Sequence, residues 1–539
     1  MMGGLQPRVR AAVIVIALLL VLIPAGVFAW QWRAMPHLGV WHDDAVYWVS
    51  AKSLADGGGY RILNLAGAPA QTKYPPLYPL LLSLVWRIAP AFPGNAPLLM
   101  LVQWSMLPLL VVLLWLWFRQ IGFADSIAAG LTAVVGLCPM TTMFATTCLS
   151  EIPFVSAVLA TLLVLGSSSR LTAKRAMLAG ICAAAAVLMR TNGIVLAAAV
   201  PIAMLLPWRR SRFRAALAFL APVLVAFAGW QLWCDAHRIA STSDIVAYYT
   251  DYTGFYRHSF SLADFPHRVW VNVDGLLTSV GRLILWSTSD ASAYRQLCWA
   301  LAIFAFIGWR DLFRRGERAS VLFATASSVL LLVWEFPPDQ RFTYPLLPFA
   351  VAGLATSIGR LVARIGLEWN TSRAAAVAMS CVVLTLPASI LLLDKAAYRE
   401  TLPQWGASQA RHAAAMRGAY AWITQNTPRG AVIAAYDDPV LWLYTARRST
   451  SVAVLPSLVY DSNNRTLTHY VAATVRDWDH SGVEYALTTP RDFSREFQET
   501  ARNAQNAELA KSWRPLVQTA DFTIWARPQP LHFAASRQD

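Results

Sequence analysis

Two adjacent carboxylates, Asp43 and Asp44, lie shortly beyond the first long apolar run of the chain, which extends from Ala11 to Trp30. A carboxylate beside a bilayer is costly, so a pair held there indicates a functional site in the first extramembrane loop. Such an acid can act as a general base, a metal ligand, a proton relay or a helix cap. Capping is the alternative explanation, because acidic residues stabilise the first turn of a helix.

A cation follows in the same loop. Lys73 and Tyr74 stand directly before Pro75 and Pro76, and the prolines fix an extended turn ahead of the apolar segment 77–92. Lys73 therefore lies near the membrane interface. Its ammonium group either contacts an anion there or extends toward water along its apolar stem.

Three more charged residues occupy the same outer ends of apolar runs. Glu151 stands beside Pro153 at a helix start, where it could also be a cap, and Arg190 and Arg341 lie in short turns. Arginines at outer ends oppose the usual charge distribution of membrane proteins, so each is expected to bind a phosphate or to pair with an acid. For Arg341 the structural alternative is an ion pair with Glu335 or Asp339.

Carboxylates and cations at one membrane surface fit the transfer of a group from a lipid phosphate. A carboxylate takes the proton of the attacking hydroxyl, and cations stabilise charge on the departing phosphate. Aromatic residues of the loop 234–295 either stack on sugar rings or anchor an amphipathic helix at the interface. They are Tyr248, Tyr249, Tyr252, Phe255, Tyr256, Phe260, Phe265 and Trp270.

The composition places these residues in a multi-pass membrane protein. Of 539 residues 56% are hydrophobic and 14% charged, and the mean hydropathy is +0.44. The net charge of +15 is explained by basic loops at one membrane surface rather than by a nucleic-acid partner. The six cysteines show no metal-ligand spacing and are expected to be buried and unpaired.

Apolar runs predict about eleven membrane spans. The first is long enough to span, which favours an uncleaved helix over a signal peptide. Segment 77–92 is short and flanked by prolines, so it is expected to be re-entrant or interfacial, although spanning stays open. The predicted spans are 11–30, 97–118, 126–146, 152–168, 174–190, 193–208, 214–233, 296–310, 319–336, 342–362 and 374–393.

The positive-inside rule orients these spans with the N-terminus in the cytoplasm of a bacterial inner membrane. The outer face then carries the Asp43 loop, Glu151, Arg190, the loop 234–295 and the turn 335–341. The predicted cytoplasmic residues are Arg119, Arg170, Lys174, Arg175, Arg209, Arg210, Arg212, Arg214, Arg310, Arg314, Arg315, Arg318, Arg360, Arg364 and Arg373.

The chain is expected to divide into a transmembrane part, 1–393, and a periplasmic tail domain, 394–539. The transmembrane part contains a first outer loop, 31–96, with the site, and the long outer loop 234–295. In the tail, a helix at Ser408–Thr424 and short strands at Ala431–Tyr436, Val452–Leu455 and Tyr485–Thr488 predict a small α/β domain.

Several motifs together resemble a known family. They are Trp41-His42-Asp43-Asp44-Ala45-Val46-Tyr47, Gly57-Gly58-Gly59-Tyr60, Lys73-Tyr74-Pro75-Pro76, Ser150-Glu151-Ile152-Pro153-Phe154, Arg341-Phe342-Thr343-Tyr344-Pro345-Leu346-Leu347-Pro348, Trp422-Ile423-Thr424-Gln425-Asn426-Thr427-Pro428 and Leu443-Tyr444-Thr445-Ala446-Arg447-Arg448. In order and sidedness they resemble the membrane glycosyltransferases with the GT-C fold that use polyprenyl-phosphate sugars, a group that includes the protein O-mannosyltransferases and the aminoarabinose transferase of lipid A.

The resemblance implies an all-α multi-pass fold with interfacial loop helices, Asp43 as the catalytic base, and Glu151 as a second acid that orients the acceptor or a metal. It also implies substrate-binding roles for Asp44, Lys73, Tyr74, Arg190, Arg341 and Tyr344. There are three departures: Asp44 stands where Glu is usual, Tyr74 separates Lys73 from the prolines, and Phe342 replaces Tyr.

The expected reaction is inverting transfer of one sugar from a polyprenyl-phosphate donor to lipid A, another glycan or a protein. A lipid-pyrophosphate glycan ligase or polymerase, a transporter or flippase, and a non-catalytic scaffold stay open as alternatives. The two separated acids leave open whether a divalent cation takes part.

Overall fold

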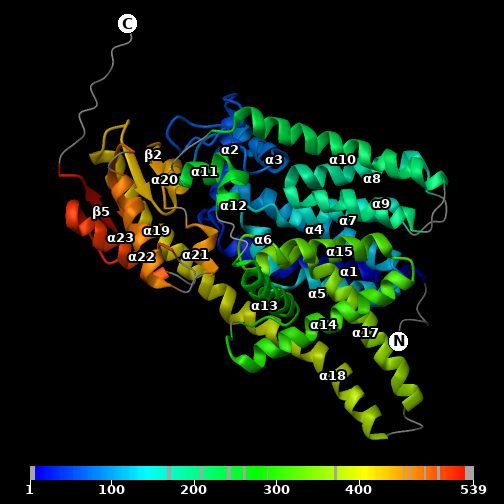
Figure 1. The fold of residues 1–539 in the computed structure, drawn as a ribbon. Helices are drawn as coiled ribbons and strands as arrows, with labels where there is room; N and C mark the ends of the chain where they lie inside the picture. The colour runs from blue at the N-terminus through cyan, green and yellow to red at the C-terminus, as the bar shows by residue number, and fades with distance from the viewer. Residues whose placement is uncertain are drawn as a thin grey trace.

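The computed structural model describes residues 7–166, 171–206, 210–239, 244–258, 263–287, 289–368, 373–452, 454–460, 463–478, 481–493 and 498–528. A large helical part is followed by a smaller tail domain that contains the only sheet of these residues. Figure 1 shows the tail domain at one end of the molecule, with most of the long helices extending away from it. The architecture is that of an all-α membrane protein with a small α/β domain.

Each predicted membrane run coincides with one helix or with two or three consecutive helical segments. These are α1 (Pro7–Gln31), α4 (Ala96–Gln120), α5 (Asp125–Gly136) with α6 (Pro139–Thr146), α7 (Glu151–Leu165), α8 (Ala173–Met189), η1 (Thr191–Ile194) with α9 (Val195–Leu205), α10 (Arg210–His237), α14 (Ser292–Arg314), α15 (Arg318–Leu332), α16 (Gln340–Thr343) with η2 (Tyr344–Leu346) and α17 (Leu347–Glu368), and α18 (Arg373–Ala396).

The number of full-length spans is smaller than the eleven predicted. Among the described residues five helices are long and apolar enough to cross a membrane, or six if α5 and α6, bent by 62°, form one span. Several of the other helices, such as α7 and α9, are shorter because the backbone breaks within the apolar runs. Pro139 starts a new helix after α5, and Gly166, with φ +60°, ends α7.

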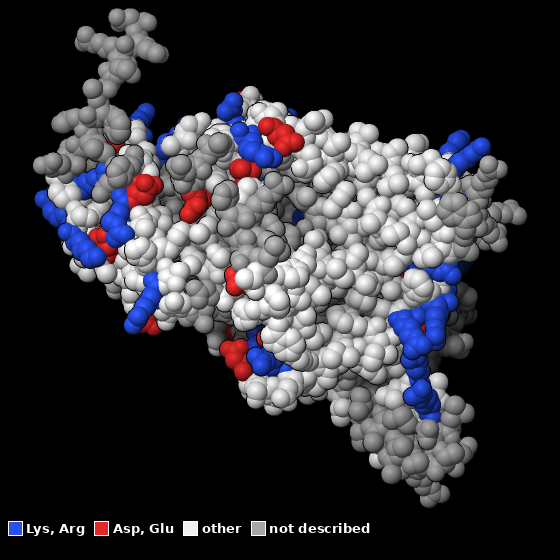
Figure 2. All heavy atoms as spheres, in the orientation of Figure 1, with Lys and Arg blue, Asp and Glu red and all other residues white. Residues whose placement is uncertain are grey.

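Basic residues gather at the end of the helical part opposite the tail domain (Figure 2). There the side chain of Arg318 donates to the carbonyl of Leu206, and Arg360 pairs with Asp311, so the ends of several helices meet in one basic surface. Arg170 and Arg209 lie outside the described residues.

The first outer loop contains two short helices, α2 (Asp43–Ala55) and α3 (Leu77–Ile88). The 12 residues of α3 extend only about 18 Å, which is too short for a bilayer core of about 30 Å. The two helices pack through stacked Trp48 and Trp86 rings, 4.5 Å apart, and α3 leaves Leu84 and Ile88 exposed. Segment 77–92 is therefore placed as an interfacial helix rather than as a span.

The second long outer loop forms α11 (Asp244–Thr250), α12 (Tyr252–His258) and the amphipathic α13 (Phe265–Ile284). The helix α13 buries Leu276 and Leu283 while it exposes Trp270, as expected of a helix held at the membrane surface. Phe260 and the side chain of Tyr256 lie outside the described residues.

The tail domain is a five-stranded mixed sheet in the order β2-β1-β3-β5-β4. Strands β2, β1 and β3 are parallel, and β5 pairs antiparallel with β3 and β4. The strands are β1 (Val432–Ala435), β2 (Arg448–Thr450), β3 (Val483–Thr488), β4 (Arg514–Gln518) and β5 (Thr523–Ala526). The helices are α19 (Leu402–Asn426), α20 (Asp438–Thr445), α21 (Pro456–Tyr460), α22 (Asn464–Asp477) and α23 (Gln498–Ser512).

One predicted strand is wrong. Among the described residues of 452–455, which are 452, 454 and 455, none lies in a strand, and β2 occurs earlier in the chain, at Arg448–Thr450. Val452 is apolar because it is buried in the core between the sheet and helices α22 and α23, not because it pairs in the sheet. The predicted boundary at residue 394 falls inside α18, which continues through the π-helical turn Ala397–Thr401 into α19.

Candidate active site

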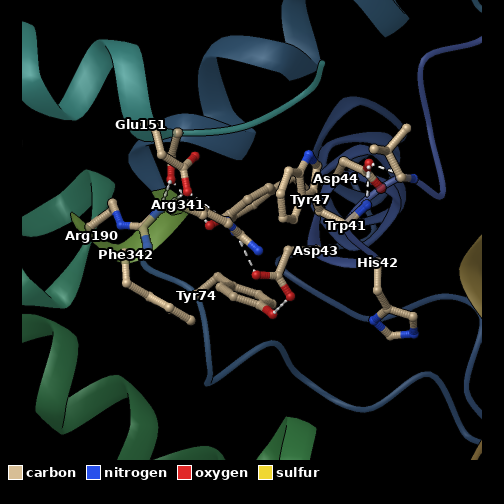
Figure 3. A network of polar contacts seen from close by, with 12 residues as sticks. Trp41, His42, Asp43, Asp44, Tyr47, Tyr74, Glu151, Arg190, Arg341 and Phe342 are labelled. Atoms are coloured by element: carbon tan, nitrogen blue, oxygen red, sulfur yellow. Dashed lines mark hydrogen bonds and ion pairs between the residues drawn. The ribbon is translucent and has the colours of Figure 1, made fainter. Parts of the chain in front are cut away.

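Asp43 and Asp44, at the start of α2, make different contacts. The carboxylate of Asp44 is fully buried and accepts the backbone N–H groups of Gly39, Val40 and Trp41 at 2.9–3.1 Å. Asp44 thus stabilises the preceding loop through hydrogen bonds from its backbone, and its predicted role in substrate binding stays a prediction. Asp43 makes no cap hydrogen bond and its side chain points away from the helix start (Figure 3).

Arg341 joins the two acids that the sequence singled out. Its Nη2 donates to Oδ2 of Asp43 at 2.7 Å, and its Nε donates to Oε1 of Glu151 at 2.7 Å. Figure 3 shows the guanidinium between the two carboxylates. Asp339 instead caps α16 by accepting the backbone N–H of Arg341, so the alternative ion pair with Asp339 or Glu335 is not formed.

Glu151 is the second acid that contacts Arg341, and it is more deeply buried than Asp43. Its side chain is 0% exposed, and its Oε1 also accepts from Nη1 of Arg190 at 2.5 Å. In this arrangement the buried Glu151 positions Arg341 and Arg190, and its predicted catalytic role stays a prediction.

Tyr74 holds Asp43 from the other side. Its hydroxyl donates to Oδ1 of Asp43, while Arg341 holds Oδ2. Burial alone would raise the pKa of Asp43, but the charges of Arg341 and Lys73 and the Tyr74 hydrogen bond outweigh it and hold that pKa below its usual range. The side chain of Asp43 is 18% exposed, so an ionised carboxylate is presented to the site.

Lys73 lies among tyrosine rings. Its Nζ is 3.0 Å from the ring centre of Tyr248 and 5.0 Å from those of Tyr74 and Tyr252. Burial lowers the pKa of Lys73 to about 7, although Asp43 and Glu335 act in the opposite direction. The aromatic residues predicted in the loop 234–295 thus help to form the site, and Lys73 does not extend toward water.

A buried amide fixes the backbone of this segment. The side-chain oxygen of Gln71 accepts the N–H groups of Lys73 and Tyr74, at 3.0 and 3.3 Å. The hydroxyl of Tyr60, at the end of the glycine turn, donates to the carbonyl of Tyr74 at 2.8 Å. Gln71 was not among the predicted residues, and an isolated glutamine offers no sequence signal.

Of the two remaining predicted residues, one belongs to this network and the other does not. Arg190 belongs to the network through Glu151 and through Ser150, whose hydroxyl lies 3.3 Å from its Nη1. Tyr344 does not, since its hydroxyl pairs with Thr141 at 3.0 Å and its ring packs edge-on against Phe144. Only 1% of Tyr344 is exposed, and its predicted role in substrate binding stays a prediction.

The tail domain reaches the residue beside Asp43. Oδ1 of Asp438 lies 3.0 Å from Nε2 of His42, and its Oδ2 accepts from Asn64 at 2.5 Å. His42 has φ +63°, a conformation that strains a non-glycine residue and persists only when neighbours hold it. This contact joins positions 396 residues apart, so sequence reasoning missed it.

The acids do not converge on a metal position. A guanidinium occupies the space between Asp43 and Glu151. In the described part of the chain, no group of three or more His, Cys, Asp or Glu side chains is arranged to hold a metal ion. A divalent cation therefore does not fit between these two carboxylates in this arrangement, and no step below depends on one.

Comparison with solved structures identifies the fold of this chain. No protein-family model and no curated protein matches the sequence. The crystal structure of ArnT from Cupriavidus metallidurans in the apo state aligns with a TM-score of 0.53 and 13% identity, over 94% of this chain and 97% of that one. The same protein bound to undecaprenyl phosphate aligns with a TM-score of 0.51 and 13% identity, over 97% and 98%.

A second relative is the archaeal oligosaccharyltransferase AglB from Archaeoglobus fulgidus, in complex with an inhibitory peptide and a dolichol-phosphate. It aligns with a TM-score of 0.51 and 13% identity, over 96% of this chain and 75% of that one. Identity this low shows the fold alone. The chain has the GT-C fold.

Proposed function

We propose that this chain is a membrane glycosyltransferase that moves one sugar from a polyprenyl-phosphate donor to an acceptor outside the cytoplasm, such as lipid A, another glycan or a protein. The proposal depends on the Asp43–Arg341–Glu151 network. In it, the accessible carboxylate of Asp43 pairs with Arg341, and the buried Glu151 holds Arg341 in position. The GT-C fold supports the same general activity.

In the proposed reaction Asp43 accepts the proton of the acceptor hydroxyl. The hydroxyl oxygen forms a bond to the anomeric carbon of the sugar, and the bond from that carbon to the phosphate oxygen breaks. The products are the glycosylated acceptor and the polyprenyl phosphate. Attack from the face opposite the phosphate inverts the anomeric configuration. Each oxygen of Asp43 accepts one hydrogen bond here and keeps a second lone pair for the proton.

Lys73 and Arg341 are the proposed contacts of the donor phosphate. Nζ of Lys73 lies against the ring of Tyr248 rather than against a carboxylate of the described residues, so its charge is available to an anion. Arg341 is divided between two acids, and a bound phosphate would compete with Asp43 for its Nη2. Release from Arg341 would raise the pKa of Asp43 and make it a stronger base when the donor is present.

The proposed location is a bacterial inner membrane with the site and the tail domain on the periplasmic face. Basic side chains gather at the end opposite the tail domain (Figure 2), and cytoplasmic loops are the ones that carry an excess of Lys and Arg. A donor with a lipid tail requires a site at the level of the bilayer surface, where α3 and α13 lie as interfacial helices.

The experiment compares the sugars of the cell envelope in a strain without the chain and in the same strain with the natural chain restored. We expect one sugar mass to disappear from a glycolipid, glycan or protein and to return on restoration, while the polyprenyl-phosphate sugar accumulates in its absence. An unchanged mass profile in both strains would contradict the proposal. Accumulation of a lipid pyrophosphate glycan instead would favour a ligase, and loss of a whole lipid from the outer face would favour a flippase.

A further inference from the structure

Glu335 is a buried acid that the proposed reaction does not use. It lies between α15 and α16, six residues before Arg341. Only 1% of the residue is exposed, and neither carboxyl oxygen has a hydrogen-bond partner among the described residues. A buried carboxyl without partners is costly, so its retention calls for a group that is present only when a ligand is bound.

The backbone around Glu335 is fixed from two sides. The side-chain amide of Asn272, on α13, donates to the carbonyls of Leu332 and Trp334, both at 3.1 Å. Asn272 in turn accepts a hydrogen bond of 2.8 Å from Tyr460 of the tail domain. These bonds hold the segment in place and so fix the position from which the Glu335 carboxyl can meet a ligand.

The opposite side of the same segment is also held. Ser279 donates to the carbonyl of Pro338 at 3.0 Å, and Gly275 approaches Pro338 so closely that an added Cβ would lie 2.9 Å from that carbonyl. Helix α13 therefore fixes both ends of the segment.

The charged neighbours of Glu335 belong to the site. Burial raises the pKa of Glu335 to about 7, the charge of Lys73 acts against this rise and that of Asp43 adds to it. Lys73 in turn is affected by Glu335 and by Asp43. The ring of Trp334, directly before Glu335, lies 5.9 Å from the ring of Phe342, directly after Arg341, so the Glu335 segment packs beside the site.

The chemistry of the carboxyl selects the part of the donor that it touches. A phosphate is an anion that offers acceptors, so it is repelled by a carboxylate rather than bound. Sugar hydroxyl and amino groups are hydrogen-bond donors, and a carboxyl oxygen accepts from them. A site built to accept such a bond discriminates strongly against a sugar that lacks the donor group, because its buried oxygens are then left unpaired.

We propose that Glu335 accepts a hydrogen bond from a hydroxyl or amino group of the transferred sugar and so determines which sugar is used. This inference rests on the proposed glycosyltransferase function. It assigns recognition of the lipid phosphate to Lys73 and Arg341, and recognition of the sugar to Glu335.

The test separates the two parts of the donor. Glu335→Ala and Glu335→Gln are compared with the natural chain, with Glu317→Gln as a matched control at the other end of α15. Two quantities are measured: restoration of the sugar mass in the envelope, and retention of undecaprenyl phosphate, which carries no sugar, by the purified protein. Thermal unfolding of each variant is recorded as a check on folding.

We expect Glu335→Ala to lower sugar transfer by about tenfold or more while retention of undecaprenyl phosphate stays within about twofold. Glu335→Gln, which keeps an acceptor oxygen, falls between Glu335→Ala and the natural chain, and Glu317→Gln behaves as the natural chain. Equal transfer by Glu335→Ala and the natural chain overturns the inference, as does loss of undecaprenyl phosphate retention in Glu335→Ala. If the natural chain itself restores no sugar mass, the proposed function fails and the inference falls with it.

Discussion

At the scale of single residues, the site depends on Arg341, because one guanidinium holds both carboxylates that the sequence singled out. The pair Asp43–Asp44 reads as one acidic motif in the sequence, yet one acid faces Arg341 and the other satisfies the backbone of its own loop. Glu151 is equally acidic but fully buried. Residue type alone therefore identified the network, whereas burial decides which member can meet a substrate.

Arg341→Ala is expected to lower retention of undecaprenyl phosphate by the purified protein by about 10- to 100-fold, because a charge-assisted hydrogen bond contributes roughly 1.5–3 kcal/mol. It also lowers the unfolding temperature, since Glu151 is left buried with Arg190 as its remaining ion-pair partner among the described residues. Arg341→Lys keeps the charge and is expected to lose less in both measurements. Undiminished retention in Arg341→Ala would remove Arg341 from the donor site.

The lowered pKa of Lys73 predicts that binding of the donor phosphate depends on pH. Its pKa of about 7 means that the free site loses this positive charge as the pH rises through neutrality. A phosphate stabilises the charged form, so undecaprenyl phosphate binding should weaken by up to about tenfold for each pH unit above 7. The measurement runs from pH 7 to 9, where the phosphate no longer changes charge, given a second pKa of about 6.

Lys73→Arg provides the comparison for that profile. A guanidinium stays charged throughout this range, so the variant should show a nearly flat profile. A decline of the same steepness in Lys73→Arg would mean that another group causes the pH dependence.

At the scale of elements, the tail domain takes part in building the site. The start of α2 is held between the helical part and the tail: Ala45 packs in a core cluster with Met416 and Ile433, and Asp438 pairs with His42. Burial alone would lower the pKa of His42, but the hydrogen bond and charge of Asp438 raise it. The tail thus fixes His42, in a strained conformation, directly before the proposed base.

Asp438→Asn is therefore expected to lower sugar transfer by about tenfold or more through loss of the carboxylate that holds His42, at unchanged abundance in the membrane. Asp521→Asn, an exposed acid elsewhere in the tail domain, is the matched control and should have no effect. As a second readout, Asp438→Glu should recover part of the activity by restoring the charge. Full activity of Asp438→Asn would show that the tail does not position Asp43.

Much of the element order was predictable, because every apolar run coincides with helices. Span lengths were not, because breaks such as Pro139 and Gly166 act within runs that look continuous by composition. Sequence patterns also placed Asp43, Lys73, Tyr74, Arg190 and Arg341 in one outer site. They could not show the roles of Asp44, Glu151 and Tyr344, which follow from burial, or the contacts of His42 with Asp438 and of Gln71 with the Lys73 segment, which follow from tertiary packing.

At the scale of the whole molecule, the cluster of basic helix ends and the proposed site lie at opposite ends of the helical part. Basic helix ends gather away from the tail domain (Figure 2), whereas Asp43, Arg341 and Lys73 lie where the first outer loop, the loop 234–295 and the tail domain meet. Of the two carboxylates that Arg341 holds, that of Asp43 is the accessible one, with 18% of its side chain exposed, whereas Glu151 is 0% exposed.

The most direct test of this account is the envelope sugar profile of a strain that carries Asp43→Asn in place of the natural chain. Asn keeps the size of the side chain and its preference for a helix start, but it cannot accept the acceptor's proton. Asp56→Asn, at the exposed end of the same helix, is the matched control. At equal abundance in the membrane, we expect Asp56→Asn to restore the missing sugar fully and Asp43→Asn to restore about a hundredth of it or less. Full restoration by Asp43→Asn would contradict the central claim that Asp43 is the catalytic base.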